Sequence, residues 1–351
     1  MSELAKRERD YGIDLIKVFA IIGVVMIHTC TTGYSGNSIL SFDWISSIFW
    51  GSVSRASVPL FFMCSGALLL DPSRELTLRK LYTKNVLRIV VSMLVWASFY
   101  KVFHLVVGKA LTVANLILAL KEVVLFRHEY HFYFLHISLI VYAFLPITRA
   151  FVKSASRKEL RYALIVWFLL GIAYPTLKPF WPLTLISGIP SQWMINMTYA
   201  SIGYGLAGYY FKTYRPSVRL SAVLTALGFS AVFGFTVYFS AKNGKLCTNY
   251  FEGMSIGVAV LAMGVFGLLY NLKDRLTAKP VQTFLRHGSN ASFCIYLVHV
   301  FWLYIFRSLK IDVNLLPCIV SVPLMVCVIA AISYLCYAVI SRIPFVKKWI
   351  I

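Results

Sequence analysis

Long apolar runs alternate with short polar segments along almost the whole chain. A transmembrane helix needs about 20 apolar residues to cross the hydrocarbon layer, and runs of that length recur throughout the sequence. The pattern predicts an all-α integral membrane protein, with about ten transmembrane helices in one domain over residues 1–351. The expected spans are 12–30, 46–70, 88–107, 131–151, 161–177, 196–211, 219–240, 253–271, 290–308 and 315–340.

Two apolar stretches do not fit this pattern of spans. Residues 111–126 form a short run that Lys121 and Glu122 interrupt, which favours an interfacial or re-entrant helix. Residues 175–195 contain Pro175, Pro179, Pro182 and Pro190, and proline removes helix hydrogen bonds. We therefore expect no regular helix between the fifth and sixth spans.

The composition excludes an ordinary water-soluble fold. Hydrophobic residues make up 59% of the 351 residues and charged residues only 13%, against about 25% charged in an average soluble domain. The mean hydropathy is +0.76. Most of the seven cysteines lie inside apolar runs and are expected to be packing residues. Cys30 and Cys247 are both expected on the outer side, which leaves a disulfide open.

The net charge of +21 comes from 34 Lys and Arg against 13 Asp and Glu. These basic residues lie in short gaps between apolar runs, which is typical of membrane topology signals and not of a nucleic-acid surface. If the first residues, with Lys6, Arg7 and Arg9, are cytoplasmic, 23 basic residues fall inside and nine outside. Both termini are therefore expected in the cytoplasm, and Lys17 and Arg55 are left within spans.

Charged side chains in the first span are functional candidates, because a charge within the bilayer is costly unless it is paired or hydrated. Asp14 and Lys17 are three residues apart and can pair on one helix face. His28 follows Lys17 by eleven residues, which places it on the same face about 16 Å further along. The alternative is that Lys17 extends to the inner interface and His28 caps the outer end.

Histidines and one arginine are expected to converge toward the outer leaflet. Arg55 in the second span falls at the depth of the first-span histidine, and so do His104, His131 and His136. Histidine is the usual general base near neutral pH, and arginine suits an anion or a developing oxyanion. His104 can instead anchor at the interface. His299 lies near mid-depth in the ninth span, where an interhelical hydrogen bond is the alternative role.

Several missing motifs narrow the function. Apart from Asp14 near a span end, no carboxylate lies deep in a span, which disfavours a proton- or sodium-coupled pump. The chain has no phosphate-binding G-x-x-x-x-G-K-[ST] loop. The segment from His128 to His131 has the wrong spacing for a zinc protease motif, and no metal is expected.

Four motifs, in order along the chain, resemble those of the acyltransferase-3 family, the multispan bacterial acyltransferases that modify cell-surface glycans. They comprise Asp14, Leu15, Lys17 and His28; the block Ser54 to Gly66; His131 to Phe134 with Leu145 and Pro146; and Ser292, Ile295, Tyr296, Leu297 and His299. The family usually has arginine where Lys17 stands. Lysine keeps the positive charge but loses the two-pronged hydrogen bonding of arginine.

The resemblance implies an enzyme of the bacterial inner membrane that moves an acetyl group from cytosolic acetyl-CoA to a hydroxyl of a lipid-linked or nascent envelope polysaccharide, such as enterobacterial common antigen. The residues implied by it are catalytic His28, Arg55, Lys17 and Asp14; substrate-binding His131, His136, Ser65, Tyr296 and His299; and acetyl-CoA-binding Lys17, Arg74, Arg79, Lys80 and Arg88. The inner basic residues can also be explained as topology signals alone.

Two other functions remain open from the sequence. Similar membrane modules are attached to serine racemases, where they are thought to move an amino acid, so a transporter of a small amino acid is the first alternative. This chain lacks the attached soluble racemase, which favours the enzyme. An exporter of acylated glycan without its own chemistry is the second alternative.

Overall fold

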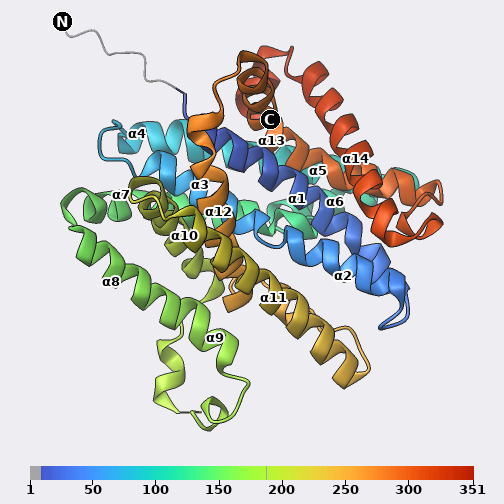
Figure 1. Ribbon diagram of the computed structural model, residues 1–351. Coiled ribbons are helices and arrows are strands. Elements are labelled where there is room, and N and C mark those ends of the chain that lie inside the picture. Colours follow the sequence, from blue (N-terminus) through green and yellow to red (C-terminus); the bar gives the residue numbers. More distant parts are fainter. Residues whose placement is uncertain (1–8, 187) are drawn as a thin grey trace, which may run out of the picture.

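The computed structural model describes residues 9–186 and 188–351, and this part of the chain is helical without any strand (Figure 1). Short π-helical and 3-10 segments join some helices, including η2 (Tyr130–Phe132) and η6 (Asn249–Phe251). The α-helices are α1 Tyr11–Gly36, α2 Phe42–Ser54, α3 Ser57–Leu69, α4 Leu78–Lys80, α5 Leu87–Val107, α6 Val113–Val124, α7 Tyr133–Ser154, α8 Arg157–Trp167, α9 Tyr174–Leu177, α10 Met197–Thr213, α11 Val218–Asn243, α12 Ile256–Asn271, α13 Lys279–Ser308, α14 Cys318–Ile340 and α15 Pro344–Trp349.

The prediction of an all-helical, multi-pass chain is confirmed. Within the described residues, nine helical stretches are long and apolar enough to cross a membrane. Each of the ten predicted spans contains a helix, and the one outside these nine is α10, which has only 17 residues. The count of ten crossings and the cytoplasmic termini stay predictions. Lys6 and Arg7, used for the orientation, lie outside the described residues.

Polar side chains mark where many of the helices begin. Ser156 and Glu159 form a reciprocal capping box at the start of α8, in which each side chain binds the other residue's backbone N–H. Such caps satisfy backbone donors that have no partner inside the helix. The other side chains that cap a helix start in this way are Asp10, Ser41, Thr77, Thr112, Asn196, Ser217 and Ser255.

The predicted second span is two helices, α2 and α3, with a break at Arg55 and Ala56. Pro59 explains the position of the break. Proline has no N–H to donate to the carbonyl four residues earlier, and its ring clashes with that carbonyl, which belongs to Arg55. The span expected over 46–70 is therefore present as two consecutive helices, and the break places Arg55 at a helix end.

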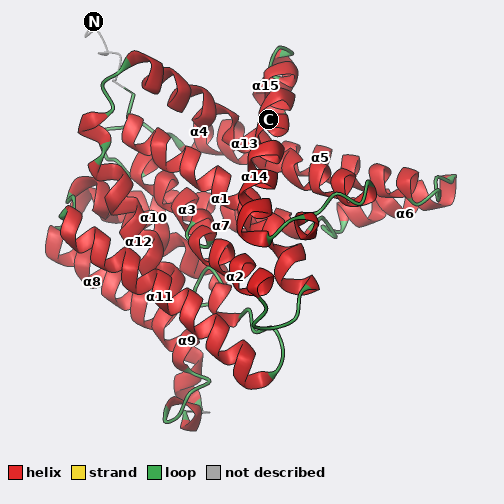
Figure 2. Cartoon of the chain, turned by 45° about the vertical axis from the view of Figure 1, so that its right-hand side comes forward, coloured by secondary structure: helices red, strands yellow, loops and turns green. Residues whose placement is uncertain are grey.

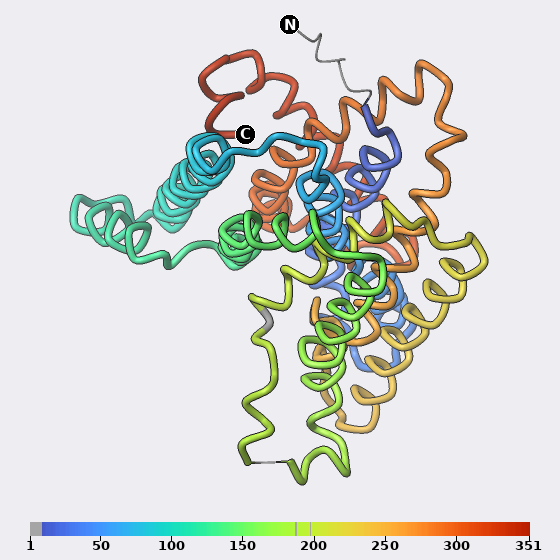
Figure 3. The backbone as a smooth tube through the Cα atoms, turned by 90° about the vertical axis from the view of Figure 1, so that its left-hand side faces the viewer, coloured from blue at the N-terminus to red at the C-terminus, as the bar shows by residue number. Residues whose placement is uncertain are grey.

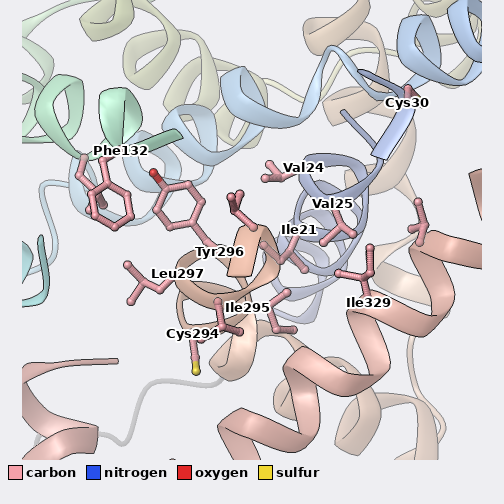
Figure 4. Packing of buried hydrophobic residues seen from close by; sticks show 14 of the residues in the cluster. Ile21, Val24, Val25, Cys30, Phe132, Cys294, Ile295, Tyr296, Leu297 and Ile329 are labelled. Carbon is pink, nitrogen blue, oxygen red and sulfur yellow. The ribbon is translucent and has the colours of Figure 1, made fainter. Parts of the chain in front are cut away.

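The helix α1 lies at the centre of the bundle and packs against α2, α3, α12, α13 and α14. Its buried residues Ile21 and Val25 lie beside Ile295 of α13 and Ile329 of α14 (Figure 4). Because these contacts surround much of α1, its buried polar side chains Asp14 and Thr29 meet protein and not lipid.

The helices α3 and α10 pack closely because glycines line their contact. A Cβ atom on Gly66 would lie 1.8 Å from the backbone oxygen of Gly205, and one on Gly208 would lie 1.9 Å from that of Met63. Small residues let two helix backbones approach in membranes. This contact fixes the short α10 in the interior beside the broken second span.

The pair α5 and α6 extends to one side of the bundle (Figures 2 and 3). The observed α6 confirms that the run 111–126 contains a helix too short to count as a span. Between α9 and α10 the described residues form only short 3-10 turns, as the prolines predicted. Cys30 and Cys247 are both free thiols, so the disulfide left open by the sequence does not form.

Candidate functional site

Arg55, at the break between α2 and α3, lines a cavity of about 300 Å³, which we call the arginine cavity. The Arg55 guanidinium lies 4.0 Å from the ring centre of Phe251, and its Nη2 donates to the Tyr34 hydroxyl at 3.3 Å. The Arg55 Nε is buried without a hydrogen-bond partner. Glu252 lines the same cavity without forming an ion pair with Arg55, so this cation is free to meet a ligand.

Three histidines from separate elements meet beside this cavity. The ring centre of His28 on α1 lies 5.1 Å from that of His299 on α13 and 6.4 Å from that of His131 in η2. The rings of His131 and His299 are 5.6 Å apart. His131 and His299 are buried, with exposed fractions of 1% and 0%. Such a cluster is expensive to bury, which indicates a functional role.

The hydrogen bonds of the cluster define its chemistry. His299 Nδ1 lies 2.7 Å from the carbonyl oxygen of Tyr296, which can only accept, so this nitrogen carries the proton. His299 Nε2 and both ring nitrogens of His131 are buried without partners. Within residues 9–186 and 188–351 the ring of His28 also makes no hydrogen bond. The cluster therefore holds several ring nitrogens that have no hydrogen-bond partner.

A larger cavity of about 660 Å³ lies where α1 begins, between α1, α3, α5, α7, α13 and α15. We call it the basic cavity, because Lys17, Lys84, Arg88 and Lys348 all line it. Tyr296 and Phe134 line both the basic cavity and the arginine cavity. These two residues therefore lie where the basic cavity and the arginine cavity approach each other. The Tyr296 hydroxyl donates to the backbone carbonyl of His131, which ties α13 to η2.

A third cavity, of about 200 Å³, also reaches His28. We call it the tyrosine cavity, because Tyr130 and Tyr304 line it. His28 is shared by the arginine and tyrosine cavities, and no residue is shared by the tyrosine and basic cavities. His28 therefore lies where two spaces meet, each large enough for a ligand group.

The structure brings together only some of the residues expected at the site. His28, Arg55, His131, Tyr296 and His299 meet at the arginine cavity or border it. The remaining predicted residues fall in the basic cavity, as Lys17, Ser65 and Arg88 do, or outside the three cavities, as Asp14, Arg74, Arg79, Lys80, His104 and His136 do.

The expected pairing of Asp14 with Lys17 is wrong. Arg9 binds the Asp14 carboxylate through two nitrogens, one of them 3.2 Å from Oδ1. Arg9 also donates to Asn290 Oδ1 at 3.0 Å. Lys17 points into the basic cavity, since the segment before α1 supplies a closer partner for the carboxylate. Asp14 thus lies in an ion pair away from the histidines, with no contact that would support its predicted catalytic role.

His136 and His104 do not join the cluster. His136 stacks on His128 at a ring distance of 5.3 Å, on another face of α7. His104 lies 2.9 Å from the Glu129 carboxylate. Neither side chain contacts His28, because helix spacing gives depth but not which neighbour a face meets. Their common depth near the outer leaflet stays a prediction.

The three inner basic residues outside the cavity are explained by local structure. Arg79 and Lys80 are exposed on α4. Arg149 of α7 donates to the backbone carbonyls of Leu69, Asp71 and Arg74, and so fixes the loop that contains Arg74. Of the five residues predicted to bind the donor, Lys17 and Arg88 line the basic cavity, and the role of the other three stays a prediction.

Sequence reasoning missed residues that reach the site from distant segments. Lys348 of α15 lines the basic cavity, and the main chain of α15 receives hydrogen bonds from Ser92 at 3.0 Å and Trp96 at 3.1 Å. Tyr304 and Arg307 line the tyrosine cavity. In the sequence, each of these is only a charged or aromatic residue near the end of a span, and its spacing does not link it to His28.

The fold and the site define a multi-pass membrane protein in which a histidine cluster lies beside an arginine that lines a cavity. Among the described residues, no group of three His, Cys, Asp or Glu side chains is arranged to hold a metal ion. A family model described as an acyltransferase domain matches residues 10–340, so the chain belongs to the acyltransferase-3 family. No curated protein and no solved structure matches the chain. The family expected from the four motifs is confirmed, and membrane acyl transfer is its general activity.

Proposed function

We propose that the protein is an inner-membrane O-acetyltransferase that moves an acetyl group from cytosolic acetyl-CoA to a hydroxyl of a lipid-linked or nascent envelope polysaccharide. Enterobacterial common antigen is the acceptor we favour, since the four motifs resemble those of its O-acetyltransferase. One observation carries the proposal: His28, beside Arg55, stands where two cavities meet. A general base and a cation that can stabilise an oxyanion thereby lie where the spaces for two substrates meet.

The chemistry of the basic cavity suits acetyl-CoA. The donor carries several phosphate charges, and Lys17, Lys84, Arg88 and Lys348 supply positive charge on the cavity wall. Arg88 Nε is buried without a partner and is available to a phosphate oxygen. Lys17 acts as a point charge here, which does not need the two-pronged geometry of arginine.

The position of the basic cavity suggests a route for the acyl group. The long pantetheine arm would extend from the basic cavity between Tyr296 and Phe134, the two side chains shared with the arginine cavity. The thioester carbonyl would then lie near Arg55 and His28. Ser65 lies in the basic cavity, so it would contact this donor arm and not the acceptor glycan.

The transfer needs one base and one stabilising cation. A His28 ring nitrogen takes the proton of the acceptor hydroxyl while the hydroxyl oxygen forms a bond to the thioester carbonyl carbon. Arg55 donates hydrogen bonds to the carbonyl oxygen as negative charge develops. The carbon–sulfur bond then breaks, and His28 returns its proton to the leaving CoA sulfur. The products are the acetyl ester and CoA.

The other two histidines would orient this base. His299 Nδ1 donates to backbone carbonyls, so Nε2 of the neutral ring is an acceptor in contact distance of the His28 ring. A hydrogen bond from His28 to this nitrogen would fix the His28 tautomer and leave its other nitrogen as the base. His299 is then a positioning residue, and His131 faces the reacting groups in the arginine cavity.

The proposal is tested with the full chain in lipid nanodiscs, radiolabelled acetyl-CoA and lipid-linked glycan extracted from bacterial envelopes. Wild type should transfer label, and His28→Ala should lose roughly 100-fold or more, the range for a general base. The control His287→Ala removes an exposed histidine of α13 and should change nothing. Full activity in His28→Ala would refute the assignment. Uptake of radiolabelled serine into proteoliposomes without acetyl-CoA, with no glycan labelling, would support the transporter.

A further inference from the structure

The tyrosine cavity has a lining suited to a sugar. The ring centre of Tyr130 lies 5.3 Å from that of His28. The Tyr304 hydroxyl donates to the Glu129 carboxylate at 3.1 Å, which holds this second ring in place. Arg307 and Thr32 add polar groups at the mouth, where Arg307 Nη2 donates to the Thr32 hydroxyl at 3.1 Å.

We propose that the tyrosine cavity is the acceptor site, where a sugar ring presents its hydroxyl to His28. The inference rests on the proposed function and names the place of its second substrate. Aromatic rings offer flat surfaces to the faces of a sugar ring. Arginine and hydroxyl side chains offer hydrogen bonds to its hydroxyl groups, and Arg307 makes no ion pair within the part of the chain that the structure describes.

The arrangement of the three cavities separates acceptor from donor. The basic cavity adjoins the arginine cavity through Tyr296 and Phe134, so a donor held there reaches His28 from the Arg55 side. The tyrosine cavity shares only His28 with the arginine cavity. A hydroxyl that arrives there would meet the imidazole where the two cavities adjoin, so that its oxygen can reach a thioester carbonyl held beside Arg55.

The size of the cavity limits what it holds. Its volume of about 200 Å³ is smaller than the roughly 300–1,000 Å³ of sites for drug-sized ligands. One sugar unit would therefore enter at a time, and the rest of the glycan would extend past Arg307 at the mouth. Such a site would select the sugar unit that carries the acetylated hydroxyl.

The test compares apparent KM values for the two substrates, with the full chain in nanodiscs, acetyl-CoA and envelope-extracted lipid-linked glycan. Arg307→Ala should raise the KM for the glycan about tenfold or more, and leave the KM for acetyl-CoA within about twofold. Thr32→Val should act in the same direction. Lys310→Asn is the control, since Lys310 lies nearby with a positive φ of 59° that asparagine tolerates.

The KM values for the glycan and for acetyl-CoA decide whether the tyrosine cavity is the acceptor site. An unchanged glycan KM in Arg307→Ala, or a raised KM for acetyl-CoA in its place, would overturn the acceptor site. If Arg307→Ala does not accumulate in the membrane, Thr32→Val carries the same comparison. Wild type that transfers no acetyl group would overturn the proposed function, and the acceptor site with it. Active wild type with unaffected Arg307 and Thr32 variants would overturn the acceptor site alone.

Discussion

Two groups of charged and ionisable residues, near opposite ends of α1, differ in whether their polar atoms have partners. Near its first turn, Arg9 pairs with Asp14, and Asp10 lies 3.7 Å from both Lys212 and Lys273. We call these five residues the paired network. Further along α1, His28 meets Arg55, His131 and His299, which we call the site cluster, and several of its buried nitrogens have no partner.

The difference separates structure from chemistry. Charges that hold helices together find opposite charges or carbonyls, because an unpaired buried charge is costly. Groups that act on a substrate must stay available until the substrate arrives. The site cluster therefore carries a cost in the free protein that ligand binding would relieve. Removing a member of the paired network should affect stability, and removing a member of the site cluster should affect activity.

After the loss of activity expected for His28→Ala, the largest effect on activity is expected when Arg55 is replaced. Arg55→Met should lower kcat roughly 100-fold to 1,000-fold, the range for losing an oxyanion partner. The free energy of unfolding should change by about 1 kcal/mol or less, because the lost contacts to Phe251 and Tyr34 are offset by removing a half-buried cation. Glycan acetylation and thermal unfolding of the same nanodisc preparation measure both quantities.

Arg55→Lys is the matched variant for this prediction. It keeps the charge but loses the planar donor pair, so part of the kcat should return. A strongly destabilised Arg55→Met with normal kcat per folded molecule would place Arg55 with the structural charges and break the contrast.

His299 sharpens the contrast within the site cluster. If it positions His28, His299→Gln should lower kcat about tenfold to 100-fold and leave the KM for the glycan nearly unchanged, since no contact to the glycan is lost. The amide of Gln can present an acceptor to His28 but is not held by the carbonyls of Ile295 and Tyr296 in the same way. An increase in glycan KM with constant kcat would show that His299 binds substrate, as the sequence first indicated.

The sequence predicts the helices well, because each span is a local property of some 20 consecutive residues. It also predicts His28 and Arg55 as site residues, because a charged or ionisable residue within an apolar run can be recognised from its neighbours in the sequence. It does not predict that Arg9 takes Asp14 from Lys17, or that His136 faces His128. Those outcomes depend on how helices rotate and on short segments outside the spans, which leave no periodic pattern.

Asp14 tests whether the paired network contributes to stability and not to activity. Asp14→Asn should lower the free energy of unfolding by about 1–3 kcal/mol, because it weakens a buried charge-assisted bond to Arg9. Glycan acetylation per folded molecule should remain within about twofold. Asp274→Asn removes an exposed partner of Arg215 and should destabilise far less. Loss of kcat in a stable Asp14→Asn protein would restore the catalytic role that the sequence indicated.

The smallest effect is expected on α6, where Glu122 accepts a hydrogen bond from Lys101 at 2.7 Å. This hydrogen bond lowers the pKa of the Glu122 carboxyl below its ordinary value. A carboxyl whose folded-state pKa is lowered contributes stability above its unfolded pKa of about 4.3, and loses it as pH falls through the folded value. Glu122→Gln should therefore lower the free energy of unfolding at pH 7 by about 0–1 kcal/mol, the range for exposed pairs, and lower Tm slightly. The difference in Tm between wild type and variant should vanish in acid.

Glu75→Gln, at an exposed glutamate outside this pair, is the control for surface charge. A pH-independent loss of stability in Glu122→Gln would mean that Glu122 stabilises α6 by packing and not by its charge.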